Sequence, residues 1–66
     1  MEKNEIEYEI NRFKQSNKPL MIKMNGGETR QVNHNSAIIK IEEDNLVINS
    51  IKLKLNDIKQ VYVKDI

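Results

Sequence analysis

Apolar residues at the start of the chain recur at helical spacing. Three of them lie at i, i+4 and i+7 and therefore on one face of a helix: Ile6, Ile10 and Phe13. Asn4 is followed three residues later by Glu7, a pattern that resembles a capping box. Pro19 disfavours helical angles at the residue before it. The pattern predicts a helix over residues 5–16.

From Leu20 onward the apolar period changes from helical to two, which is typical of half-buried strands. The first alternating run ends in the sequence "NGG", a strong hairpin signal because Asn and Gly accept positive φ. A long second strand is expected over residues 29–41, with a polar centre at "NHNS". Short strands then follow the turns "EEDN", "NS" and "ND". Five short strands within residues 20–64, joined by tight turns, favour a small antiparallel barrel with the helix over one open end.

The chain has 66 residues and no cysteine. This length predicts one domain, residues 1–66, and a domain of this size buries only about 60% of its unfolded surface. Disulfides are excluded, so self-association through strand edges is an available source of extra stability. The longest apolar runs are three residues, which predicts no membrane-spanning segment and no signal peptide.

The order of motifs in the second half resembles the YolD-like family, whose chains place an "I-x-x-I", a turn, a short apolar strand and an "I-x-L-x-D-I-x-x-I" in succession. The matching positions here are Ile38 and Ile41, then residues 46–48, then Ile51, Leu53, Asp57, Ile58 and Val61. The front half, a helix followed by "KPLMIKMNGGE", fits as well. The resemblance implies an α+β, mostly β fold, an N-terminal helix capping a five-stranded Sm-like (SH3-like) small barrel. It also implies a bacterial or phage context, without an agreed reaction.

Two differences from the YolD-like family and from other Sm-like barrels limit which functional residues can be assigned by resemblance. YolD-like and Hfq-like chains usually place a glycine inside the long second strand, where this chain has "NHNS" at residues 33–36. The Hfq "Y-K-H" signature before the last strand is replaced by "LKLND", and the Trp-Tyr-Leu signature of WYL domains is missing. No RNA-binding or nucleotide-binding residue is therefore assigned by resemblance.

The residues offer little that is typical of catalysis. Ser36 and His34 share a strand face, but no third group completes a nucleophilic set. The acidic run at residues 42–44 lies in a polar turn, which does not raise a carboxyl pKa for acid–base work. The two glycines do not open a helix and so make a poor phosphate loop. We therefore expect no enzyme, no cofactor and no metal site.

Two tyrosines are predicted to point outward. Tyr8 lies nearly opposite Ile10 on a helical wheel and beside Arg12, and Tyr62 alternates away from its valine neighbours. Tyr and Arg are enriched at protein–protein hot spots. With Arg30 and His34 they form the predicted partner-binding set. The favoured function is a small non-enzymatic interaction module that binds a host protein or itself, as a regulator or inhibitor encoded by a phage or a low-GC bacterium and acting in the cytoplasm.

The alternative function is nucleic-acid or nucleotide binding around the first hairpin. Its basic residues would be Lys23, Arg30, His34 and Lys40. The net charge of +1 and the pI of 8.0 lack the strong basic excess that is usual for such proteins. The polar centre Asn33–Ser36 has two open interpretations: a binding surface beside Arg30, or a bend held by local backbone hydrogen bonds in place of glycine.

Overall fold

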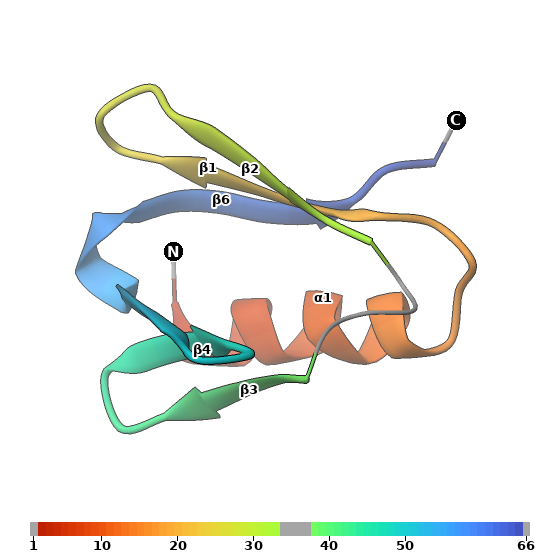
Figure 1. Ribbon diagram of the computed structural model, residues 1–66, viewed down its shortest axis with the longest axis horizontal. Helices are drawn as coiled ribbons and strands as arrows, with labels where there is room; N and C mark the ends of the chain where they lie inside the picture. Colours follow the sequence, from red (N-terminus) through yellow and green to blue (C-terminus); the bar gives the residue numbers. More distant parts are fainter. Residues whose placement is uncertain (1, 34–37, 66) are drawn as a thin grey trace.

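The computed structural model describes residues 2–33 and 38–65. It contains one helix, six strands and a short 3-10 turn (Figure 1). In chain order the elements are α1 (Lys3–Lys14), β1 (Leu20–Met24), β2 (Thr29–Val32), β3 (Ile39–Glu42), β4 (Asn45–Ile48), β5 (Ile51–Lys54), η1 (Leu55–Asp57) and β6 (Ile58–Val63).

The helix begins and ends two residues earlier than predicted. It runs from Lys3 to Lys14 and buries the three apolar residues that the spacing placed on one face. Its N-cap is Glu2, which makes no side-chain capping bond. The capping box predicted at Asn4 is therefore wrong: Asn4 lies inside the helix, and its Oδ1 accepts a hydrogen bond from the Glu5 N–H at 3.0 Å. The helix thus depends on its buried face rather than on a cap.

The first sheet has the strand order β2-β1-β6, and all pairs are antiparallel. In the hairpin between β1 and β2, Gly27 alone has a positive φ, of 94°. Asn25 does not take the left-handed conformation predicted for the turn. Instead its N–H donates to the Asp57 carbonyl at 2.8 Å, and its side-chain amide donates to the Asn56 carbonyl at 2.8 Å. Asn25 therefore ties the first hairpin to η1.

The second sheet is a meander with the strand order β3-β4-β5. Its two turns are tight, and each has one residue with a φ of 56°, Glu43 in the first and Asn49 in the second. Asn49 also donates its N–H to the Ile38 carbonyl at 2.7 Å and accepts the Ile38 N–H on Oδ1 at 2.9 Å. Asn49 thus forms the turn through its backbone conformation and fixes the start of β3 through its side-chain hydrogen bond.

The predicted five-stranded barrel is wrong. The described residues form two separate three-stranded antiparallel sheets and no closed barrel. The long strand expected over residues 29–41 is divided, because apolar alternation stops after Val32 and resumes at Ile39. Its first part pairs with β1 and its second part with β4, so each joins a different sheet. The polar residues 34–36 lie outside the described residues, so neither interpretation of that segment is decided.

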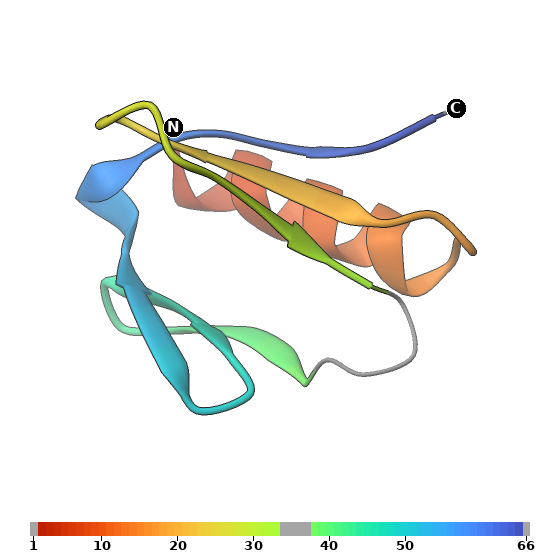
Figure 2. The same ribbon diagram turned by 45° about the horizontal axis from the view of Figure 1, so that its top comes forward.

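The helix packs between the two sheets, in contact with β6 and β1 on one side and β3 on the other (Figures 1 and 2). Its buried face joins the inward side chains of both sheets in one core. The side chains buried most completely are Phe13, Ile6, Leu20, Ile22, Leu46, Ile58 and Val61. The outer faces and the strand edges remain as surfaces on which a site can lie.

Candidate interaction surfaces

On the outer face of α1, the structure places Tyr8 and Arg12 in different situations. Tyr8 is 62% exposed and points away from the core, as predicted. The Arg12 guanidinium is paired on both sides, with Glu9 Oε1 at 3.0 Å and Asp65 Oδ2 at 3.4 Å. Arg12 therefore links the helix to the chain beyond β6, and its charge is already partly neutralised.

Tyr62 lies on the outer face of the first sheet. It is directly opposite Met21 in the register of β6 and β1 and is half-buried. Lys23 Nζ sits 5.9 Å from the centroid of its ring, within cation–π range. Tyr62 therefore points away from the core from the first sheet, and Tyr8 does so from the helix.

The remaining predicted residues are also spread over the molecule. Arg30 is exposed on the edge strand β2 and pairs with Glu28 Oε1 at 3.2 Å. Lys40 belongs to the other sheet, where its Nζ lies 3.3 Å from Glu42 Oε2. His34 lies outside the described residues. Of the predicted nucleic-acid set, the structure brings Lys23 near Tyr62 but does not bring the cations together.

Sequence reasoning missed an apolar row that crosses the second sheet to its open edge. Ile39, Ile48 and Ile51 are opposite one another on the three strands. Their exposed fractions are 3%, 8% and 51%. The alternation of "IKLKL" predicts Ile51 inward with Leu53, but Ile51 is exposed, because β5 is an edge strand and alternation alone could not reveal that. Ile38, at the same end of the sheet, is 73% exposed.

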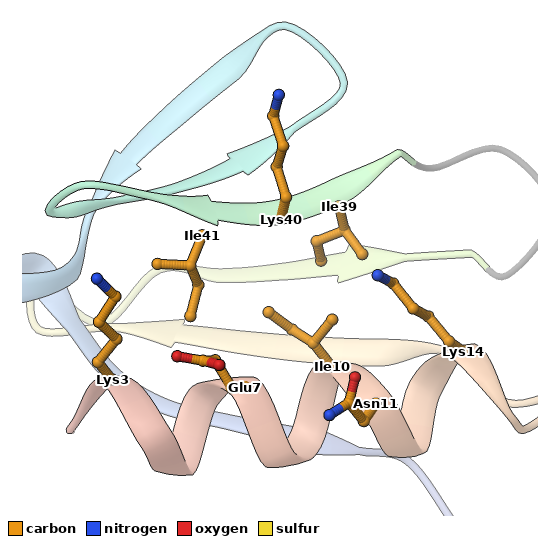
Figure 3. Close-up of a pocket in the computed structure, with 8 residues that line it drawn as sticks. All are labelled: Lys3, Glu7, Ile10, Asn11, Lys14, Ile39, Lys40 and Ile41. Carbon is orange, nitrogen blue, oxygen red and sulfur yellow. The ribbon is translucent and has the colours of Figure 1, made fainter.

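A groove of about 410 Å³ runs between α1 and β3 (Figure 3). Isoleucines at positions 10, 39 and 41 form its apolar floor, and helix residues line one side. Lys3 and Lys14 stand at its two ends. Lys40 rises away from the helix toward the β4–β5 hairpin (Figure 3). No sequence pattern pointed to this groove, because its walls come from elements that are distant in the chain.

Within the part of the chain that the structure describes, no group of three or more His, Cys, Asp or Glu side chains could hold a metal ion. No helix among these residues is long and apolar enough to cross a bilayer. No family model, curated protein or solved structure matches the chain.

Proposed function

We propose that this chain is a small non-enzymatic protein-interaction module that binds an extended segment of another protein, or of a second copy, at the open edge of β5. The observation that carries this proposal is the apolar row that ends uncovered at Ile51. An additional strand on β5 would continue the row and bury the half-exposed side chain. Such strand addition is a recurring mode of peptide recognition.

The backbone of β5 supports this mode. β4 and β5 are joined by a two-residue turn, so Ile51 and Leu53 exchange hydrogen bonds with β4. The N–H and C=O groups of Lys52 and Lys54 then face the open edge. Their positive side chains limit indiscriminate strand pairing and favour a partner with acidic residues.

The YolD-like resemblance supports a bacterial or phage context, and the proposed place of action is the cytoplasm of a bacterium or a phage-infected host. A regulator or inhibitor fits this proposal because such proteins act by occupying a surface rather than by chemistry. Tyr8 on the helix is a second exposed aromatic that a large partner would reach.

The test compares the wild-type chain with Ile51→Lys, and uses Thr29→Lys, which adds the same charge at an exposed strand position of the first sheet, as the matched control. Sedimentation velocity over a range of concentrations reports self-association, and affinity capture from a low-GC bacterium reports another partner. We expect an association, of either kind, that Ile51→Lys abolishes. A chain that stays monomeric and captures nothing that depends on Ile51 would overturn the proposal.

A second candidate function is nucleic-acid binding on the outer face of the first sheet, favoured by Lys23 beside the ring of Tyr62. Aromatic rings on a sheet with adjacent cations stack bases in single-stranded binding proteins. Fluorescence anisotropy with a labelled single strand tests it. Affinity that is lost in Tyr62→Ala and falls steeply with salt would support this candidate; no measurable binding at low salt would rule it out.

A further inference from the structure

We propose that the groove between α1 and β3 is a second binding site, which takes an extended peptide with two acidic residues flanking an aliphatic one. This proposal rests on the proposed function only in taking a protein segment as ligand, since its surface is separate from the β5 edge.

One wall of the groove is the unpaired edge of β3. β3 and β4 are joined by a two-residue turn, so Glu42 and Asn45 form a hydrogen-bonded pair, and the Asn49 N–H donates to the Ile38 carbonyl at 2.7 Å in the same register. Because such pairs alternate along an antiparallel ladder, the backbone N–H and C=O groups of Lys40 and Glu42 point toward β4. The N–H and C=O groups of Ile39 and Ile41 therefore point to the free edge of the sheet, where no strand among residues 2–33 and 38–65 pairs with them.

The opposite wall supplies charge at both ends. Among the described residues, neither Lys3 nor Lys14 has an ion-pair partner within 4.0 Å, although both line the groove with Glu7 between them. The helix rises about 16 Å from Lys3 to Lys14, which is the length of about five extended residues. Because the two ammonium groups stand at opposite ends, an extended ligand with two acids suits them better than a small anion.

The floor defines the middle of the ligand. Ile10 and Ile39 are buried, whereas Ile41 is only half-buried and leaves apolar surface open to the groove. In an added strand every second side chain would face this floor. The matching pattern is acid-x-aliphatic-x-acid, which puts the aliphatic side chain over Ile41 and Ile10 and the acids about 13 Å apart, within reach of the flexible lysines.

The probe is a capped, fluorescein-labelled peptide with the core Asp-Thr-Val-Thr-Asp, measured by fluorescence anisotropy at low and moderate salt. We expect saturable binding to the full chain and none for the peptide with Lys in place of both Asp. Lys3→Glu combined with Lys14→Glu should weaken binding at least tenfold. Lys59→Glu with Lys64→Glu makes the same change in net charge at exposed positions outside the groove and the β5 edge, and should alter the affinity less than twofold.

Two further measurements keep the outcome clear. The double variant Lys3→Gln with Lys14→Gln removes both charges without adding negative ones, so it is less disruptive to folding than the glutamate pair. It should weaken peptide binding about fivefold. Two further peptides carry N-methyl groups, one at the two Asp and the Val positions and the other at the two Thr positions. Only one of these peptides should retain affinity, because in an added strand only one of the two sets of N–H groups faces β3.

Absence of binding, equal losses in both Lys-to-Glu pairs, or equal behaviour of the two methylated peptides would each overturn the site. Sedimentation with phosphatidylglycerol vesicles that depends on Lys3 and Lys14, without peptide binding, would overturn it in favour of a lipid ligand. Ile51→Lys should leave peptide affinity unchanged, so failure of this site and failure of the β5 interface are distinguishable.

Discussion

Replacement of Asn49 by alanine tests how the second sheet is held together. Asn49 has a φ of 56° and its Oδ1 accepts the Ile38 N–H at 2.9 Å. A left-handed conformation costs an ordinary residue about 1–2 kcal/mol, and asparagine is one of the residues that visit it routinely. The lost hydrogen bond contributes about 1 kcal/mol. We therefore expect Asn49→Ala to lower the free energy of unfolding by about 2 kcal/mol.

Urea and thermal unfolding followed by circular dichroism measure this change, and a loss of that size lowers the Tm of so small a domain by roughly 10 °C. Asn49→Gly keeps the backbone conformation and loses only the side-chain bond, so it should cost about half as much. Glu43 is the matched control, because it has the same φ of 56° and its side chain is exposed. Glu43→Gly should stabilise the fold by about 1 kcal/mol. Equal stability of the alanine and glycine variants at position 49 would refute the reasoning.

Three other substitutions have expected outcomes that the same unfolding measurements check. Phe13→Ala removes the largest fully buried side chain and should lower the free energy of unfolding by about 3–5 kcal/mol. A decrease below about 1 kcal/mol would contradict the described core. Gly27→Ala places a Cβ at a φ of 94° and should cost about 1 kcal/mol although nothing lies within 4 Å, so strain alone is tested. Asp65→Asn breaks two exposed ion pairs, to Arg12 and Lys18, and should change stability by less than about 1 kcal/mol, with a larger loss indicating a cooperative network.

The helix and the strands were largely readable from periodicity, since the core selects the apolar residues at each period. Ile6, Ile10 and Phe13 are buried as the spacing predicts. The sheet assignment was not readable in this way. Whether a strand joins a barrel or ends a sheet depends on pairing between distant segments, and alternation within Thr29–Val32 is the same in both cases.

The candidate surfaces show the same difference between features set by local geometry and features set by the packing of distant elements. Tyr8 is exposed where the helical wheel placed it, because a wheel depends only on local geometry. Whether the members of the predicted partner-binding set lie together depends instead on which strands pair and which sheet face the helix covers. The groove beside β3 and the open row ending at Ile51 likewise depend on layer packing, so neither has a signature in the sequence.

The register of β1 with β6 has a consequence for how the chain folds. Leu20 pairs with Val63, so the whole second sheet lies in the loop between the partners. Closing a loop of that length costs roughly 3 kcal/mol of chain entropy, whereas the β3-β4-β5 meander closes through two tight turns. The meander should form early and the β1–β6 pairing last. During synthesis β1 therefore keeps an unpaired edge until β6, the last of the described strands, has emerged.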